Sequence, residues 1–245
     1  MTALVLLHAF PLSARMWDPL LTRLDGEVVA PQLPGFGGTP APAEPPSLDA
    51  FADAVASEMD SRRLDRAALC GLSLGGYVAM AFARRHADRL AGLVLADTKA
   101  SADPPAARDN RERIARTVLA EDSTRVLLDD VLPALLGPTT TTQRPEVVAT
   151  VRGMVERADP AGVAWAQRAM AARPDSFDVL RGLRVPALVV VGEDDTLSPV
   201  ADAQAMADAL PDARLVVVPG AGHLTALEDP DAFAAAVVAF VPEVG

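Results

Sequence analysis

Short apolar runs alternate along the chain with segments in which apolar positions recur every three or four residues. The first pattern is typical of strands buried on both faces of a parallel sheet, and the second of amphipathic helices. The apolar runs are Ala3–Leu7, Val28–Ala30, Ala67–Cys70, Leu90–Ala96, Ala187–Val191 and Leu215–Val218. The helical segments of this alternation are Met16–Leu24, Leu48–Arg63, Leu74–Arg85, Val200–Leu210 and Pro230–Phe240. The pattern predicts an α/β fold with a mostly parallel sheet of about six strands and helices on both faces.

The alternation of strands and helices stops at Asp97 and resumes at Val185. The residues between them have helical periodicity, interrupted by breaks rich in proline and glycine. The helical segments are Ala106–Leu119, Ser123–Leu136, Glu146–Arg157 and Ala161–Ala171. We therefore predict a core of residues 1–98 and 183–245, with a helical cap of residues 99–182 inserted before the last two strands. The threonine run at 139–142 is expected to be a solvated loop between helices.

Composition and charge limit the kind of protein and the kind of partner. The 245 residues, half of them hydrophobic, suffice for one buried core with an insertion. The formal net charge of −11 opposes binding to nucleic acid or to an anionic membrane surface. These properties favour a small molecule, neutral or weakly polar, as the binding partner.

The single cysteine and the start of the chain bear on location. Cys70 is the only cysteine, so no intramolecular disulfide can form and we expect a cytoplasmic protein. The apolar run Ala3–Leu7 lacks a basic segment before it and a small-residue cleavage site after it, which favours a strand over a signal peptide. No apolar stretch approaches the roughly 20 residues that a membrane-spanning helix requires.

A candidate nucleophile lies in the segment Gly71–Gly76, which reads Gly-Leu-Ser-Leu-Gly-Gly. It follows an apolar run and opens a helical segment, which is the context of a nucleophile elbow. A serine on such a sharp turn has a strained backbone, and the residues two before and two after it must be small so that strand and helix can approach. Gly71 and Gly75 meet that requirement. The segment predicts Ser73 as a nucleophile, and a glycine-rich turn with an incidental serine is the alternative.

A serine hydroxyl needs a neutral imidazole to accept its proton and a carboxylate to orient that imidazole. The chain has three histidines. His86 lies among charged residues at a helix end, which indicates a solvated surface position, and His8 ends the first expected strand. His223 lies in a glycine-rich turn just past the last strand, at the edge where parallel sheets place their sites. We therefore predict His223 as the base.

Two carboxylates remain open as the partner of His223. Asp195 follows the fifth expected strand and Asp97 follows the fourth. Both lie between Ser73 and His223 in the chain, so the order of the residues does not distinguish them.

Four segments together make the chain resemble the α/β-hydrolase family. Beside the nucleophile motif, Gly192–Asp195 is similar to the family's G-x-x-D loop and His8–Pro11 to its H-G-x-P loop. The segment Pro31–Thr39 is similar to the loop written D-x-x-G-x-G-x-S. This chain departs from the pattern at Ala9, where the family has glycine, and at Gln32, where it has aspartate. The resemblance extends over nearly the whole chain and implies the same α/β fold.

The resemblance also implies roles for individual residues. It makes Asp195 the acid that orients His223, although some members place the acid after the earlier strand, which here is Asp97. Acyl transfer develops an oxyanion, and two backbone N–H groups can stabilise it. One belongs to Leu74, which follows the nucleophile at a helix N-terminus. The second, by resemblance to the H-G-x-P loop, belongs to Phe10.

The nucleophile limits the reaction. The haloalkane dehalogenases and epoxide hydrolases of this family use an aspartate where this chain has Ser73. The expected function is cleavage of a small carboxylic ester or lactone through an acyl-enzyme, and the chain is similar to bacterial carboxylesterases and 3-oxoadipate enol-lactonase-like proteins. Thioesterase and carbon–carbon bond hydrolase remain alternatives, as does a non-catalytic ligand-binding relative. Resemblance at the level of the fold does not identify the substrate.

The expected cap contains four apolar candidates for the substrate pocket. They are Trp165, Met154, Met170 and Leu132, and ordinary core packing is the alternative interpretation for each of them. No residues have the spacing of a metal site, so we expect catalysis without a metal or cofactor. The sequence leaves the oligomeric state open.

Overall fold

The computed structural model describes residues 2–241 and 244. Its centre is a sheet of six strands in which all neighbouring strands are parallel. The strands are β1 (Ala3–Leu7), β2 (Val28–Val29), β3 (Ala67–Leu72), β4 (Leu90–Ala96), β5 (Ala187–Gly192) and β6 (Ala213–Val218), in the order β2-β1-β3-β4-β5-β6. The predicted α/β fold with a parallel sheet is confirmed.

The pairing register aligns the carboxyl ends of the central strands. Leu7 lies opposite Gly71, and Leu72 lies opposite Ala96. β1, β3, β4 and β5 are buried along their whole length, which explains their continuous apolar sequence, whereas the edge strand β6 is only partly buried. The loops that follow these strands therefore begin at one edge of the sheet, where open α/β sheets bind their ligands.

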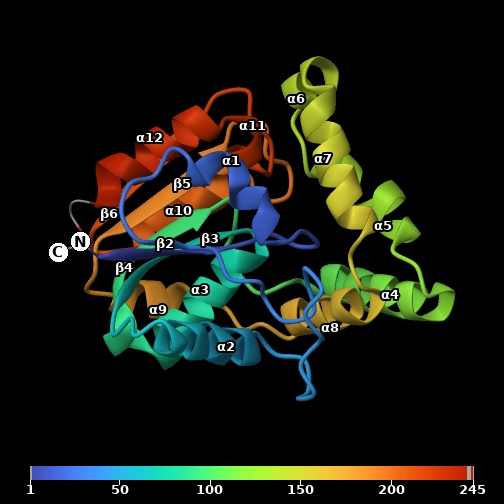
Figure 1. Cartoon of the computed structure of the whole chain (residues 1–245), viewed down its shortest axis with the longest axis horizontal. Helices are drawn as coiled ribbons and strands as arrows, with labels where there is room; N and C mark the ends of the chain where they lie inside the picture. Colours follow the sequence, from blue (N-terminus) through green and yellow to red (C-terminus); the bar gives the residue numbers. More distant parts are fainter. Residues whose placement is uncertain (1, 242–243, 245) are drawn as a thin grey trace.

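Helices cover both faces of the sheet (Figure 1). One face carries α2 (Leu48–Ser61), α3 (Leu74–Arg85), α9 (Phe177–Gly182) and α10 (Val200–Ala209), with the short 3₁₀ turn η2 (Ala87–Arg89) after α3. Each of these α-helices contacts the next along the row, and α3 packs directly on β1, β3 and β4. The other face carries the 3₁₀ turn η1 (Ala14–Trp17), α1 (Asp18–Leu21), α11 (Thr225–Glu228) and α12 (Pro230–Phe240). This arrangement follows from right-handed crossovers between parallel strands.

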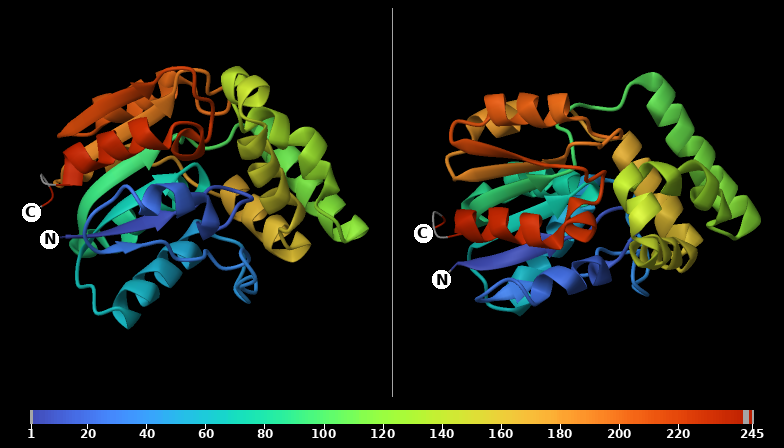
Figure 2. Two further views of the ribbon diagram at one scale, coloured as in Figure 1. Left: turned by 45° about the horizontal axis from the view of Figure 1, so that its top comes forward. Right: turned by 90° about the horizontal axis from the view of Figure 1, so that it is seen from above.

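The remaining helices lie beyond the carboxyl ends of the strands (Figures 1 and 2). They are α4 (Pro105–Glu121), α5 (Arg125–Asp130), the 3₁₀ turn η3 (Leu132–Ala134), α6 (Pro138–Gln143), α7 (Pro145–Glu156) and α8 (Pro160–Ala171). α4 packs along α8, and α5 contacts α4 and α7. Four of these helices begin with proline, whose fixed φ suits the first helical turn.

Two expectations about local structure were wrong, the threonine loop and the two continuous helical segments. The threonine run at 139–142 is part of α6 and not a loop: the helix begins at Pro138, and the Thr141 and Thr142 hydroxyls donate hydrogen bonds to the Pro138 carbonyl. The segments Met16–Leu24 and Ser123–Leu136 are each broken into a 3₁₀ turn and a short α-helix. α9 lies inside the predicted cap range but contacts α3 and α10 of the core.

No helix within the described residues is both long enough and apolar enough to cross a membrane. Cys70 is a buried free thiol in β3.

Candidate active site

Ser73 lies on the sharp turn between β3 and α3, with a φ of 55° and a ψ of −111°. Two glycines make this turn possible. A Cβ on Gly71 would lie 2.1 Å from the Gly75 carbonyl oxygen, and a Cβ on Gly75 would lie 2.0 Å from the Leu7 carbonyl oxygen. Since real Cβ atoms do not approach backbone so closely, any larger residue would push α3 away from the sheet. The spacing of the motif is therefore a packing requirement, and it holds the serine in a strained conformation.

Ser73, His223 and Asp195 form a continuous chain of hydrogen bonds. The Ser73 Oγ is 2.8 Å from the His223 Nε2, and the His223 Nδ1 is 2.9 Å from the Asp195 Oδ2. The three residues follow β3, β6 and β5, whose carboxyl ends lie along one edge of the sheet. His223 and Asp195 are buried, and Ser73 is partly exposed. The arrangement gives the serine hydroxyl a proton acceptor that is itself oriented by a carboxylate.

The carboxylate of Asp195 is surrounded by hydrogen-bond donors from its own loop. The backbone N–H groups of Leu197 and Ser198 donate to Oδ1, and the Ser198 hydroxyl donates to Oδ2 at 3.0 Å. Burial by itself would raise the pKa of Asp195, but the hydrogen bond and charge of His223 and these donors outweigh burial and lower it. Asp195 therefore stays ionised. Sequence reasoning missed Ser198, whose Oγ also lies 3.2 Å from the His223 Nδ1.

Asp97, the second candidate acid, is buried and bonded elsewhere. Its Oδ1 accepts the N–H of Gly192 at 3.0 Å, and its Oδ2 accepts the N–H and the hydroxyl of Thr225 at 3.0 and 2.6 Å. Burial and then the nearby charge of Asp195 raise its pKa well above the ordinary range. Asp97 thus joins the end of β4 to the end of β5 and to the start of α11, two residues beyond His223.

A third buried carboxylate, Glu228, holds the loop that carries His223. Its Oε1 accepts the N–H groups of Gly222 and Leu224, and its Oε2 accepts the N–H of Gly137 at 2.8 Å. One side chain therefore fixes both neighbours of the histidine and ties them to the segment between η3 and α6. Sequence reasoning did not single out Glu228. Its local sequence, Thr-Ala-Leu-Glu-Asp, carries no signal of this role.

His8 braces the first loop and is not part of the hydrogen-bonded chain around Ser73. Its Nε2 accepts the N–H of Leu33 at 3.1 Å, so the proton lies on Nδ1, which is 3.0 Å from the Ala9 carbonyl oxygen. Burial lowers the pKa of His8 to about 4, an effect that the Ala9 carbonyl only partly offsets. Ala9 is not among the residues with positive φ, so alanine fits this loop without the freedom of glycine. His86, at the end of α3, instead pairs with Asp53 of α2.

The backbone N–H groups of Phe10 and Leu74 lie in segments that adjoin Ser73. Leu74 is the first residue of α3, so its N–H has no acceptor within the helix. Across the described residues, no acceptor is hydrogen-bonded to either N–H. Phe10 lines the same cavity as Ser73 and His223. Both donors are thus available to a bound oxygen atom.

Ser73 and His223 open into a cavity of about 270 Å³. Much of its wall comes from the helices beyond the sheet, with Ile114 from α4, Met170 from α8, and Val131, Ala134 and Leu135 beside η3. Polar groups on the wall include Tyr77, Lys99 and Arg111. The cavity is large enough for a small organic substrate and combines apolar surface with a few polar groups, as ligand sites do.

Of the four apolar candidates from the sequence, Met170 lines this cavity and the other three do not. Trp165 packs edge-on against Phe51 of α2, with ring centroids 4.8 Å apart, and its Nε1 donates to the Glu44 carbonyl at 3.0 Å. Met154 borders a separate surface depression between α7 and α1. Leu132 is buried in η3. Helical periodicity identified these side chains as inward-facing but did not distinguish the one that faces the cavity.

A search of the described residues finds no group of three or more histidine, cysteine, aspartate or glutamate side chains that could hold a metal ion.

Comparison with known proteins gives three kinds of similarity. A family model described as "Alpha/beta hydrolase family" matches residues 4–236. The chain is 34% identical over 240 residues to a pimeloyl-[acyl-carrier protein] methyl ester esterase of Aromatoleum aromaticum, covering 93% of each chain. A thermophilic esterase from Thermogutta terrifontis, solved with malate bound, has a TM-score of 0.96 and 39% identity, covering 100% of this chain and 90% of that one. An enol-lactonase from Burkholderia xenovorans has a TM-score of 0.90 and 31% identity, covering 98% and 91%.

Proposed function

The chain belongs to the alpha/beta hydrolase family, and on that basis we propose that it is a serine hydrolase that cleaves small carboxylic esters or lactones. The observation that carries this proposal is the hydrogen-bonded chain from Ser73 through His223 to Asp195, which opens into a cavity. A glycine-rich turn with an incidental serine does not require an imidazole and a carboxylate in this arrangement. The similarity to proteins named esterase and enol-lactonase supports the same class of reaction.

The first half of the reaction forms an acyl-enzyme on Ser73. The Ser73 Oγ attacks the ester carbonyl carbon while His223 takes the hydroxyl proton at Nε2. Asp195, which stays ionised, stabilises the positive imidazole that results. The N–H groups of Phe10 and Leu74 stabilise the oxyanion, each donor contributing on the order of 3 kcal/mol. Collapse of the tetrahedral intermediate breaks the bond to the alcohol oxygen, which receives the proton from His223.

The second half releases the acid and regenerates the serine. His223 removes a proton from a water molecule, whose oxygen attacks the acyl carbon under the same two N–H groups. The Ser73 Oγ leaves with the proton that His223 returns. The products are a carboxylic acid and an alcohol, or a hydroxy or keto acid when the substrate is a lactone or enol-lactone. No metal or organic cofactor enters this sequence.

Residues 99–182 act as a cap in this proposal, over a core of residues 1–98 and 183–245. The support is that residues between α4 and α8 form much of the cavity wall next to Ser73. At the carboxyl end of the cap range, α9 contacts α3 and α10 of the core. A cap of this kind selects substrates and excludes water from the acyl-enzyme.

The substrate class has two branches within ester cleavage. Methyl ester cleavage is suggested by the name of the Aromatoleum relative, and enol-lactone opening by that of the Burkholderia neighbour. Thioesters and activated carbon–carbon bonds use the same nucleophile and stay as alternatives, as does the non-catalytic ligand-binding relative. We also propose a cytoplasmic location, from the single cysteine Cys70.

Labelling and turnover test this function together. The wild-type protein should hydrolyse a short-chain p-nitrophenyl ester and react with a fluorophosphonate probe. Ser73→Ala should lose labelling, and its turnover should fall on the order of 10⁶-fold, as when a serine hydrolase loses its nucleophile. Ser57→Ala makes the same chemical change on the exposed face of α2, away from the cavity, and serves as the control. Equal labelling of the Ser73 variant and the wild type would disprove the proposal.

A further inference from the structure

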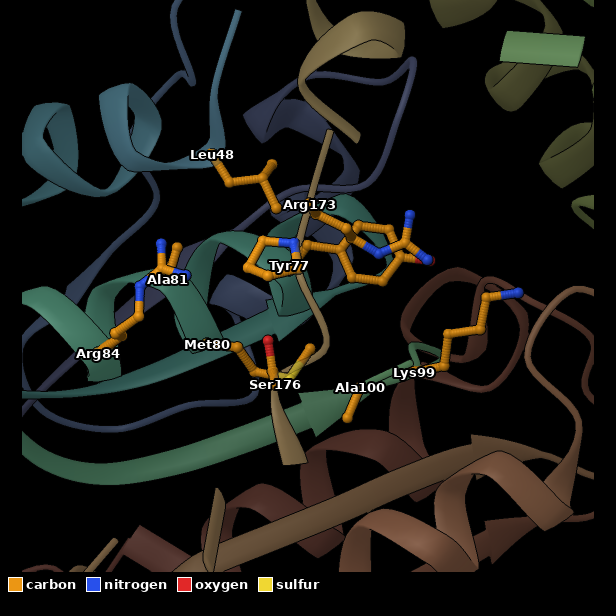
Figure 3. Close-up of a pocket in the computed structure, with 10 residues that line it drawn as sticks. Leu48, Tyr77, Met80, Ala81, Arg84, Lys99, Ala100, Arg173 and Ser176 are labelled. Carbon is orange, nitrogen blue, oxygen red and sulfur yellow. The ribbon is translucent and has the colours of Figure 1, made fainter. Parts of the chain in front are cut away.

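Asp103 and Arg111 of the cavity wall form one connected group with Arg173 of an adjoining pocket. Asp103 accepts hydrogen bonds from two guanidinium groups, Arg111 at 2.5 Å and Arg173 at 2.8 Å, and is itself almost completely buried. The Arg173 guanidinium lies 4.1 Å from the centre of the Tyr77 ring. Tyr77 and Lys99 line the cavity and also a smaller pocket beside it, shown in Figure 3. The group therefore reaches from the end of β4 to the helices α4 and α8.

Arg111 is held in place with hydrogen-bonding capacity left over. Its Nε donates to Asp103, and its Nη1 donates to the Gln167 side chain at 3.0 Å. Among the described residues, no acceptor is bonded to its Nη2, and the side chain is 20% exposed. A guanidinium fixed on two sides and open on the third loses little further entropy when it binds a carboxylate.

Lys99 is the only lysine of the chain, and it stands next to the nucleophile in the structure. The residue before it, Thr98, donates a hydrogen bond from its hydroxyl to the Ser73 carbonyl at 2.9 Å. The Lys99 ammonium has a long contact of 3.4 Å to the Leu197 carbonyl, and no described carboxylate lies within 4.0 Å of it. In Figure 3 it points away from Tyr77 and Arg173. The other cations of the cavity wall have carboxylate partners, whereas this one does not.

Lys99 is the cationic group of the cavity wall that no described carboxylate neutralises. Arg111 shares the Asp103 carboxylate with Arg173 of the adjoining pocket, and Asp130, which also lines the cavity, is paired with Arg113. A positive group between low-dielectric walls attracts a ligand of the opposite charge.

We propose that the substrate carries a carboxylate a short chain away from its scissile ester, and that Lys99 and Arg111 bind this carboxylate. The proposal rests on the proposed ester hydrolysis and specifies its substrate class. The apolar wall around Ile114 and Leu135 receives the carbon chain between the two groups. The distal carboxylate then fixes the ester carbonyl at Ser73, and a neutral ester lacks this anchor.

Paired substrates isolate the contribution of the carboxylate. Monomethyl esters of succinic, glutaric and adipic acid are each compared with the methyl ester in which a neutral amide replaces the free acid. The ratio of kcat/KM for acid over amide is measured by release of methanol. We expect the ratio in the wild type to exceed about ten for at least one chain length, which corresponds to a single charge-assisted hydrogen bond.

Three variants assign the effect to Lys99. Lys99→Met should lower the ratio of acid over amide at least tenfold, mainly through KM for the acid. Lys99→Arg keeps the charge and should retain most of the ratio. Arg62→Met removes one positive charge from the exposed end of α2 and should match the wild type. A wild-type ratio at or below one, or equal ratios for Lys99→Met and Arg62→Met, would overturn the proposal.

The two proposals fail in distinguishable ways. If the wild type hydrolyses neither member of any pair and no p-nitrophenyl ester, ester hydrolysis itself is wrong. If it hydrolyses both members equally and Ser73→Ala abolishes both, only the carboxylate site is wrong.

Chemical modification tests the carboxylate site without a variant. Glutarate should slow acetylation of Lys99 by an N-hydroxysuccinimide ester, and glutaramide should not. Peptide mapping measures the extent of acetylation. Equal protection by the two compounds would contradict the carboxylate site.

Discussion

The loops of the core and the helices beyond the sheet meet at one cavity but are held in different ways. The core loops are fixed by buried polar side chains that accept backbone N–H groups. Asp97 binds Gly192 and Thr225, Glu228 binds the neighbours of His223, and His8 binds Leu33. The bonds of Asp97 and His8 join segments that are distant in sequence, and those of Glu228 fix the turn around His223, so the atoms of the reaction are placed by hydrogen bonds of defined geometry.

The helical region combines apolar packing with polar links between its helices. α4 packs on α8, where the partly exposed Arg168 pairs with Glu112, and Trp165 packs against Phe51. Exposed ion pairs contribute little and apolar contacts have no strict direction, so such helices can shift with smaller loss than a broken buried hydrogen bond would cause. From this comparison we expect the core loops to determine whether the reaction proceeds, and the helices to determine which substrate enters.

Among variants of the core loops, we expect the largest difference in turnover between those of the two candidate acids, Asp195 and Asp97. Asp195→Asn removes the charge that orients and stabilises His223, and turnover should fall by about 10⁴, as in serine proteases with the same change. Asp97→Asn should cost about 1 to 3 kcal/mol of stability and leave turnover largely intact. Replacing a carboxylate that accepts three hydrogen bonds by an amide lowers the stability. Removing a buried negative charge beside Asp195 offsets part of that loss. Steady-state kinetics and urea unfolding measure the two effects.

Ser198→Ala is a useful control for the first of these variants. It removes one donor to the Asp195 carboxylate and leaves the charge and the His223 contact in place, so its turnover should lie between those of Asp195→Asn and the wild type. If Asp97→Asn proved the more damaging to turnover in a folded protein, the acid would belong to the end of β4.

Acid should weaken the core loops through His8. The pKa of His8 in the folded protein is about 4, below the ordinary value of 6.5, because burial disfavours the charged ring. Between these values the unfolded chain takes up a proton that the folded chain does not, so the free energy of unfolding falls as the pH falls. The loss from this group is roughly 3 kcal/mol between pH 7 and pH 4.

His8→Gln supplies the comparison for this titration. Glutamine can accept the Leu33 N–H but has no basic site, so the stability of the variant should not depend on this titration. The wild type should therefore lose roughly 3 kcal/mol of stability relative to the variant between pH 7 and pH 4. Urea unfolding at several pH values measures both curves, and parallel curves would show that His8 does not titrate in this window.

The sequence was sufficient for much of the core because its structure depends on local patterns. Parallel strands buried on both faces must be apolar, and the elbow needs glycine at Gly71 and Gly75, so both features can be read directly. Resemblance chose Asp195 over Asp97, and the hydrogen bonds of the structure support that choice. Ser198 and Glu228 could not be found in this way, because a serine or glutamate acquires its role only when distant segments meet.

The cavity wall could be predicted only in part, for a related reason. Periodicity indicates which face of a helix is buried, but it does not indicate the element that the face contacts. Trp165 and Met170 both lie on α8 and are both buried, yet only Met170 lines the cavity. The orientation of α8 against α4 and α2 decides between them, and that orientation arises from long-range packing.

The smallest expected effects separate these two kinds of buried residue in the helical region. Ile114→Val removes one methylene from the cavity wall, and a methylene in an apolar pocket changes discrimination between substrates by about 1 kcal/mol. The ratio of kcat/KM for a longer ester over a shorter one should therefore rise several-fold.

Trp165→Phe leaves the cavity unchanged and loses the hydrogen bond to the Glu44 carbonyl. About 1 kcal/mol of stability should therefore be lost, with no change in chain-length preference. A homologous series of p-nitrophenyl esters, with urea unfolding of both variants, makes the measurement. The contrary result is that Trp165→Phe shifts the chain-length preference as much as Ile114→Val does. That result would mean that the helices move as one body with the cavity wall, and the distinction between wall and packing residues would not hold.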